Sequence, residues 1–168
     1  MTIDMATIKL VISDVDGSLV KTKSGATFRK TADDWQWLPG RLEKLQELHR
    51  QGKRLSFASN QGGVAYGYME ETDIIEQLYI MVSQIMGESK PEYFYMGVCF
   101  THPKASLPEY RQDDQRRKPG PGMLLEAMEH CHVEPEQTLM VGDRPEDEEA
   151  AKAAGCVFMW SEAFFREM

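Results

Sequence analysis

A short apolar run that ends in two aspartates, close to the start of the chain, constrains the fold most. Leu10 to Ile12 are apolar, Asp14 and Asp16 follow them, and Gly17 comes next. An apolar run that stops at a Gly-containing turn is typical of a buried strand in a parallel sheet. Alternation along an extended backbone places both aspartates on one side. Because two carboxylates on one side repel each other, we expect a cation or a shared proton there.

Strand and helix patterns alternate along the rest of the chain. We expect further strands at 54–59, 93–99, 138–141 and 156–159, and helices at 41–48, 70–85, 121–131 and 145–154. Strand, helix, strand spacing is the signature of βαβ units. The sequence therefore predicts an α/β fold, with a Rossmann-like, doubly wound parallel sheet of about five strands and helices on both faces.

Two segments lack this periodicity and are predicted to lie beside the site. Residues 19–38 form an expected irregular flap, and residues 99–117 an expected loop. About 40 residues separate Ser18 from Ser59, and about 57 separate Asn60 from Lys118. Helix, strand and loop use up both spans, so we expect a single domain over 1–168 with no separate cap domain. A site without a cap shields its chemistry less and admits a large or extended substrate.

Composition narrows the class of protein. A chain of 168 residues with 42% hydrophobic residues suits one folded domain. A net charge of −8 disfavours a wide nucleic-acid footprint. Three cysteines are too few, and odd in number, for a secreted disulfide framework. With no signal peptide and no apolar span, we expect a cytoplasmic monomer or small homo-oligomer without a membrane partner.

Polar side chains gather at or just after the predicted strand ends. They form four clusters along the chain: Asp14 and Asp16, Ser59 and Asn60, Arg117 and Lys118, Asp143 and Asp147. Each has an ordinary structural explanation, such as turn chemistry, helix capping or a solvated charge. Together, however, carboxylates, a hydroxyl and a lysine at one sheet edge suit Mg²⁺ and a phosphoryl group. An aspartate can then attack phosphorus while a second carboxyl protonates the leaving alkoxide.

In order along the chain, the four clusters resemble the four motifs of haloacid-dehalogenase (HAD) phosphatases. The matching stretches begin at Asp14, Ser59, Arg117 and Val141, and the resemblance runs from about Lys9 to Cys156. It implies Asp14 as a nucleophile that forms an aspartyl-phosphate, and Asp16 as general acid and then base.

The same resemblance implies the remaining roles at the site. Ser59 and Lys118 would bind phosphate, with Asn60 and Arg117 as further candidates for binding substrate. Mg²⁺ would take Asp14, the backbone carbonyl of Asp16, and Asp143. Asp147 would be the supporting acid that orients Lys118 or a metal-bound water.

Two branches of HAD subfamily IIIA are similar in different segments. The Ser59 and Arg117 motifs resemble the branch that dephosphorylates heptose bisphosphate and histidinol phosphate, which often carries a zinc loop. Here the loop keeps Cys99 and His102 but lacks two cysteines, so we expect no structural zinc.

The flap instead resembles that of polynucleotide kinase-phosphatases in their 3′-phosphatase domain. Lys23 is its candidate phosphate contact, and Lys21, Arg29 and Lys30 make it locally basic. Trp35 and Trp37 are more simply explained as apolar anchors of the flap.

We therefore predict a Mg²⁺-dependent phosphomonoester hydrolase acting on a small phosphorylated metabolite of the histidinol-phosphate or sugar-phosphate type. The main alternative is a polynucleotide 3′-phosphatase acting on DNA or RNA ends. A non-catalytic phosphate-binding protein and a phosphotransferase are the other hypotheses. The complete set of motif residues disfavours a non-catalytic protein. Asp16 as a base and a site open to water disfavour a phosphotransferase.

Overall fold

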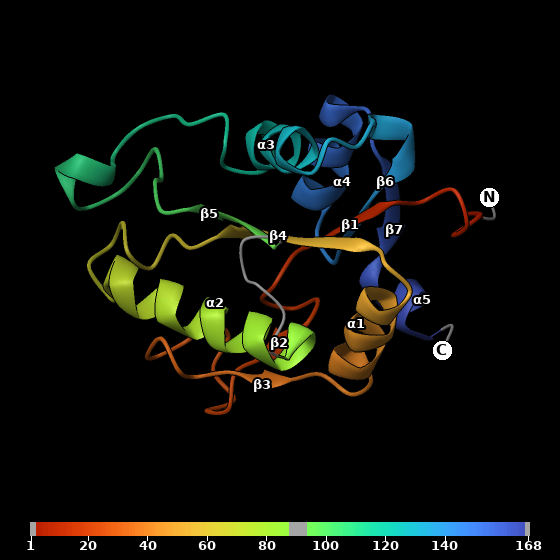
Figure 1. Cartoon of the computed structure of the whole chain (residues 1–168). Coiled ribbons are helices and arrows are strands. Elements are labelled where there is room, and N and C mark those ends of the chain that lie inside the picture. Colours follow the sequence, from red (N-terminus) through yellow and green to blue (C-terminus); the bar gives the residue numbers. More distant parts are fainter. Residues whose placement is uncertain (1–2, 88–93, 167–168) are drawn as a thin grey trace.

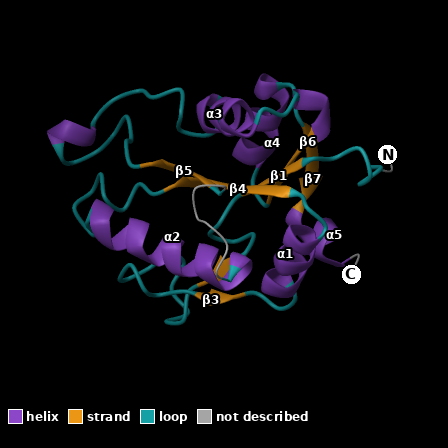
Figure 2. Cartoon of the chain, viewed as in Figure 1, coloured by secondary structure: helices purple, strands orange, loops and turns teal. Residues whose placement is uncertain are grey.

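The computed structural model describes residues 3–87 and 94–166, and its centre is a five-stranded parallel sheet. The strand order is β5-β4-β1-β6-β7. The strands are β1 (Leu10–Ser13), β4 (Arg54–Asn60), β5 (Tyr95–Cys99), β6 (Thr138–Gly142) and β7 (Val157–Trp160). The predicted α/β class and parallel sheet are confirmed, and each boundary falls within two residues of the expected one (Figure 2). Tyr93, where one strand was expected to begin, lies outside the described residues.

Helices cover both faces of the sheet (Figure 1). On one face lie α1 (Arg41–Arg50), α2 (Glu71–Met86) and α5 (Ser161–Arg166), and on the other lie α3 (Gly122–Cys131) and α4 (Pro145–Ala154). No helix or strand was expected after residue 159, so α5 is an addition to the expected elements. Its Phe164 and Phe165 are buried in the same core as α1 and α2.

Strand β1 separates two hydrophobic cores. Val11 packs with the residues of α1 and α2, whereas Leu10 and Ile12 pack with those of α3 and α4. All of β1 is buried, which explains why its sequence is a continuous apolar run rather than an alternating one. Full burial of each of these large apolar side chains stabilises the fold by about 1.5–3 kcal/mol.

The flap is not irregular throughout, which corrects the sequence-based expectation. It contains a short antiparallel pair, β2 (Val20–Lys21) with β3 (Gln36–Trp37). Strands of two residues are too short to produce a periodic pattern, so the sequence gives no signal for them.

Two tryptophans fasten the flap to α2, as the anchor interpretation predicts. Trp35 donates its indole N–H to Gln77 Oε1 at 2.9 Å, and Trp37 donates to Gln84 Oε1 at 2.6 Å. The two rings also meet edge to face, with centroids 5.8 Å apart. Buried indoles usually find a partner for the N–H, and here both partners lie on one helix.

The strand order determines where a ligand can bind. Strands β4 and β5 extend the sheet on one side of β1, and β6 and β7 extend it on the other. The order therefore reverses between β1 and β6, and doubly wound sheets bind ligands at the carboxyl ends of the strands beside such a point. Over residues 3–87 and 94–166, no helix has the length and apolar character needed to cross a membrane.

Candidate active site

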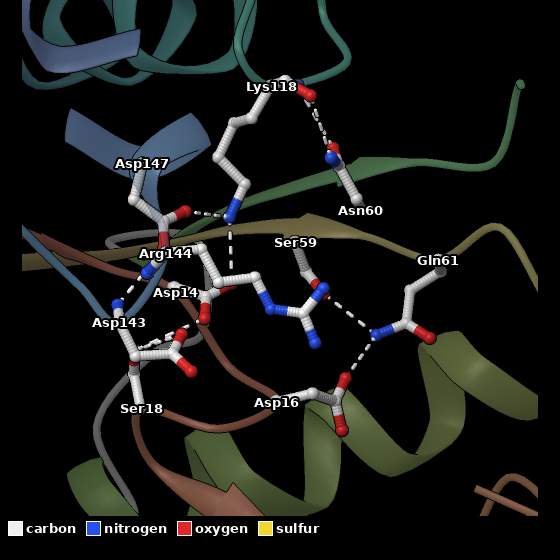
Figure 3. Close-up of polar contacts among 10 residues, drawn as sticks. All are labelled: Asp14, Asp16, Ser18, Ser59, Asn60, Gln61, Lys118, Asp143, Arg144 and Asp147. Atoms are coloured by element: carbon white, nitrogen blue, oxygen red, sulfur yellow. Dashed lines mark hydrogen bonds and ion pairs between the residues drawn. The ribbon is translucent and has the colours of Figure 1, made fainter. Parts of the chain in front are cut away.

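Asp14 follows β1 at the carboxyl end of the sheet and is 7% exposed. Its backbone N–H donates to Val141 O at 2.9 Å, which continues the pairing with β6 past the end of the strand. Its side chain has a different neighbour on each oxygen: Lys118 Nζ lies 2.7 Å from Oδ1, and Ser18 Oγ lies 3.2 Å from Oδ2 (Figure 3). The sheet therefore sets the position of this carboxylate.

Lys118 is buried between two aspartates. Its ammonium lies 2.7 Å from Asp14 Oδ1 and 2.7 Å from Asp147 Oδ1 (Figure 3). Burial alone would lower the pKa of Lys118, but the two carboxylates outweigh it and raise that pKa above its ordinary value. Lys118 therefore stays charged, which is what a buried phosphate ligand needs.

Burial has the opposite consequence for Asp14. It raises the pKa of this carboxyl to about 6, although the charge of Lys118 opposes the rise, and a hydrogen bond with the Asp143 side chain adds to it. The ordinary value for such a group is 3.8. A second cation beside Asp14 would favour the ionised form and lower its pKa again.

Asp147 is the first-turn acid of α4 and has both oxygens occupied. Oδ1 accepts from Lys118, and Oδ2 accepts the backbone N–H groups of Asp143 and Arg144, each at 3.1 Å. Burial raises its pKa. Gly142 lets it approach, because a Cβ at that position would lie 2.3 Å from Asp147 Cβ.

Asp143 faces Asp14 across Ser18. The Ser18 hydroxyl lies 3.1 Å from Asp143 Oδ1 and 3.2 Å from Asp14 Oδ2. Gly17 makes this approach possible, since a Cβ there would lie 2.3 Å from Asp143 Oδ2 and its φ is +93°.

Asp14, Asp143 and Asp147 each offer an oxygen within 4.8 Å of the other two. This all-oxygen donor set fits Mg²⁺, which prefers carboxylates. The oxygens of Asp147 already accept from Lys118 and two backbone N–H groups, so the pair Asp14 and Asp143 fits the ion best.

Asn60, at the end of β4, reaches the backbone of Lys118. Its Nδ2 donates to Lys118 O at 3.0 Å, and its Oδ1 accepts from Lys118 N at 3.1 Å. This reciprocal pair uses both ends of the amide, so in the structure Asn60 positions Lys118. Asn60 also lines the pocket, and its binding of substrate stays a prediction.

Gln61 links the second and first motifs. Its Nε2 lies 2.8 Å from Ser59 Oγ and 2.8 Å from Asp16 Oδ2. Ser59 is 1% exposed and serves as the acceptor in this contact, which leaves its own hydroxyl hydrogen for another partner. Gln61 belongs to the motif that begins at Ser59 but was expected to have no role of its own, because the sequence does not show which groups its side chain reaches.

Comparisons with known proteins agree with this geometry. The family model described as polynucleotide kinase 3 phosphatase matches residues 9–164. The chain belongs to the polynucleotide kinase 3 phosphatase family. It is thereby a member of HAD subfamily IIIA, which confirms the resemblance found in the four motifs.

Two relatives of this chain are named as phosphatases. D-glycero-beta-D-manno-heptose-1,7-bisphosphate 7-phosphatase of Escherichia coli strain K12 is 34% identical over 122 residues, covering 73% of this chain and 63% of the relative. The enzyme of the same name from Pasteurella multocida strain Pm70 is 33% identical over 146 residues, covering 87% and 77%. The aligned part thus spans less than two thirds of the first of these relatives.

A solved structure also resembles this chain. The D,D-heptose 1,7-bisphosphate phosphatase of B. bronchiseptica, complexed with magnesium and phosphate, superposes with a TM-score of 0.71. The identity is 27%, over 90% of this chain and 79% of that one. The HAD-like fold expected from the sequence is confirmed.

In this protein, a pocket of about 820 Å³ opens over the carboxyl ends of the strands. Asp14, Asp16 and Lys118 line its floor, and flap residues 20–22 and 25–29 line a wall. Arg117 also lines it, half-buried, with Nη1 donating to Thr101 O at 3.1 Å. Lys23 is exposed and is not among the described pocket-lining residues, whereas Arg29 is.

The loop of Cys99 and His102 is stabilised by other contacts. Cys99 Sγ lies 3.2 Å from Thr101 Oγ1, and Thr101 donates to Asp114 at 3.2 Å. His102 Nδ1 instead accepts the backbone N–H of Lys104 at 2.9 Å. Cys99 and His102, which a zinc loop would use together, therefore have different partners in this protein.

Proposed function

We propose that the chain is a Mg²⁺-dependent phosphomonoester hydrolase that works through an aspartyl-phosphate on Asp14 and acts on a small phosphorylated sugar. The observation that carries this proposal is the buried bridge of Lys118 between Asp14 and Asp147 at the carboxyl end of the sheet. A nucleophilic carboxylate beside a fixed cation is the arrangement that attack on an anionic phosphoryl group requires, because the cation offsets the repulsion between the two.

In the first step the Asp14 carboxylate attacks phosphorus and the ester P–O bond breaks. Asp16 gives its proton to the departing alkoxide, which leaves as the alcohol. Asp14 Oδ1 lies on the side of Lys118, and Oδ2 on the side of Ser18 and Asp143. We therefore assign Oδ1 as the attacking oxygen.

In the second step water attacks phosphorus, Asp16 takes a proton from it, and the bond to Asp14 breaks. Inorganic phosphate and the free carboxylate result. Lys118 and the Ser59 hydroxyl hold the phosphoryl oxygens through both steps, so that positioning and charge neutralisation supply most of the rate. Gln61 keeps Ser59 and Asp16 in register, since one amide nitrogen contacts both.

Mg²⁺ would be held by Asp14, Asp143 and the backbone carbonyl of Asp16. When bound, it neutralises charge on the phosphoryl group and orients it. Asp147 and Asn60 act through Lys118, the first on its ammonium and the second on its backbone. Arg117 contributes a positive charge to the wall of the pocket.

A phosphorylated sugar is supported by the two relatives, both named for a heptose bisphosphate. The pocket volume is within the range of small-molecule sites. The net charge of −8 disfavours an extended nucleic-acid partner.

The three cysteines are free, which supports the proposed cytoplasmic location.

A polynucleotide 3′ end is the second candidate substrate, and two aromatic side chains favour it. Phe28 on the flap is 72% exposed and Tyr68 is 75% exposed, and both line the pocket. Exposed rings beside a phosphate site can stack on bases. Phosphate release with Mg²⁺ should be measured on sugar phosphates, histidinol phosphate, mononucleotides and a 3′-phosphorylated oligonucleotide.

Preference for a sugar phosphate, little affected by salt, is the expected result. Preference for the oligonucleotide, falling steeply with added salt, would instead assign the second candidate.

The nucleophile is tested by Asp14→Asn. We expect kcat to fall by about 10⁴-fold or more, because an amide cannot form the acyl phosphate. Asp113→Asn makes the same change on an exposed loop residue and should leave kcat unaltered. Appreciable activity in Asp14→Asn, after freshly purified protein is checked for deamidation by mass spectrometry, would contradict the assignment.

A further inference from the structure

Arg29 is a buried cation on an otherwise exposed part of the flap. It is 8% exposed, whereas the preceding Phe28 is 72% exposed. Its Nε donates to Asp16 Oδ1 at 2.7 Å, and its Nη1 donates to Ala32 O at 2.9 Å. The first contact places the guanidinium against the proposed general acid, and the second ties it to the flap backbone.

The third nitrogen of this guanidinium has no partner. Within the described residues, Arg29 Nη2 is the buried side-chain nitrogen or oxygen that lacks a hydrogen bond. A buried donor left unpaired destabilises a protein, so such atoms are rare and call for an explanation. A ligand that supplies the missing acceptor is one explanation.

The geometry of the guanidinium gives the direction of that donor. The guanidinium is planar, and the N–H bond of Nε is parallel to one N–H bond of Nη2. Because Nε donates to Asp16 Oδ1, the parallel N–H of Nη2 is directed to the Asp16 side of the guanidinium, in a residue that lines the pocket. Gln61 donates to the other oxygen of Asp16, and Nη2 makes no hydrogen bond to that carboxylate.

We propose that Arg29 is a specificity-determining residue whose Nη2 donates to an oxygen on the leaving alcohol, next to the ester oxygen that Asp16 protonates. This inference rests on the proposed phosphatase function, in which Asp16 faces the leaving group. Lys118, the proposed phosphate ligand, contacts Asp14 Oδ1, whereas Arg29 contacts Asp16, the proposed acid for the leaving group. The spare donor therefore serves the alcohol. An acceptor on the carbon next to the phosphorylated one is within the reach of such a donor.

Recognition of this kind separates substrates that have the oxygen from those that lack it. A buried donor that stays unpaired in the complex penalises the poorer substrate. 2-Hydroxypropyl phosphate, with a hydroxyl next to the phosphorylated carbon, and propyl phosphate, which lacks only that hydroxyl, form a matched pair of probes. For the wild-type protein with Mg²⁺, we expect kcat/KM to favour 2-hydroxypropyl phosphate by about tenfold or more.

Two variants test the assignment through the ratio of these two kcat/KM values. Arg29→Met removes every donor, and the ratio should fall to near one. Arg29→Lys keeps a cation that can reach Asp16 but lacks the parallel N–H donor, so the ratio should also fall while activity on propyl phosphate is better preserved. If Arg29→Met does not fold, as judged by its thermal unfolding, Arg29→Lys decides. Lys30→Met removes a charge from the same flap but is exposed and outside the pocket, so the ratio should stay at its wild-type value.

The opposite results are equally specific. If the Arg29 variants slow both esters equally and keep the wild-type ratio, Arg29 acts only on Asp16 or on folding, and the inference is overturned. Equal hydrolysis of both esters by the wild-type protein overturns it as well. Failure of the wild-type protein to hydrolyse any phosphate ester would overturn the proposed function, and this inference with it.

Discussion

The floor and the flap of the pocket are held in place in different ways. The floor is built on the sheet and the helices beside it. Asp14 continues the pairing of β1 with β6, Asp147 accepts backbone N–H groups at the first turn of α4, and Lys118 is held between these two aspartates. The flap is held by side-chain contacts, chiefly those of Trp35, Trp37 and Arg29. In the proposed mechanism, phosphoryl chemistry would therefore depend on the sheet and its helices, and the choice of alcohol on the flap.

Lys118→Met removes the cation of the floor and should have the largest effect on stability. The change leaves Asp14 and Asp147 buried without their cation, which destabilises the protein by about 3–5 kcal/mol. Loss of the phosphate ligand should lower kcat/KM by about 10³-fold. Lys152→Met, on the exposed side of α4, is the matched control for urea unfolding and for activity. If Lys118→Met retained wild-type stability, the buried bridge would not be the element that holds the floor.

The pH dependence of Mg²⁺ binding tests the proposed metal ligand Asp14 on the floor of the pocket. Burial raises the pKa of Asp14 to about 6, so in the metal-free protein this carboxyl takes up a proton as the pH falls below that value. Because Mg²⁺ is proposed to bind the ionised form of Asp14, its apparent affinity should weaken by up to about tenfold per pH unit below about 6 and level off above it. Binding near pH 5.5 should release a proton.

Calorimetric titration in two buffers of different ionisation enthalpy measures both the affinity and the proton release. Asp14→Asn should abolish the release. An affinity that is constant from pH 5 to 7 would show that Asp14 does not titrate with the metal.

Asp34→Asn loosens the flap and should have the smallest effect. Asp34 accepts the backbone N–H of Lys30, the Ser24 hydroxyl and the Ser24 N–H, at 2.9, 2.7 and 2.9 Å. These hydrogen bonds, that from Lys30 first, lower its pKa to about 2. This stabilisation is present above the unfolded pKa near 4 and is lost only as the pH falls towards 2.

In Asp34→Asn, an amide nitrogen faces one of these donors. We expect KM to rise by about two- to fivefold with kcat little changed, since one hydrogen bond contributes about 1 kcal/mol. Steady-state kinetics measures this, with exposed Asp33→Asn as the control. A fall in kcat as large as that of Lys118→Met would mean that the flap takes part in the chemistry.

The same division explains what could be predicted from the sequence. Asp14 and Asp143 were expected to meet because strand ends of a parallel sheet share one edge, and local patterns reveal strand ends. Lys118 was expected at the same edge although it precedes a helix and does not follow a strand. The roles of Asn60 and Arg29 depend on which group each side chain reaches after folding. Asn60 reaches the Lys118 backbone. In the flap Arg29, and not Lys23, enters the pocket, and no periodicity distinguishes one basic residue from another in an irregular segment.

The two indole contacts of the flap have a consequence for how this protein can diversify. Gln77 and Gln84 lie seven residues apart on α2, about two helical turns, so one face of one helix carries both fastening points. Residues 22–34 lie between β2 and the two tryptophans, and Arg29 ties them to Asp16. A replacement segment that keeps both tryptophans would retain the attachment to α2. A graft of this kind would alter the range of esters accepted and leave the machinery for cleaving them in place.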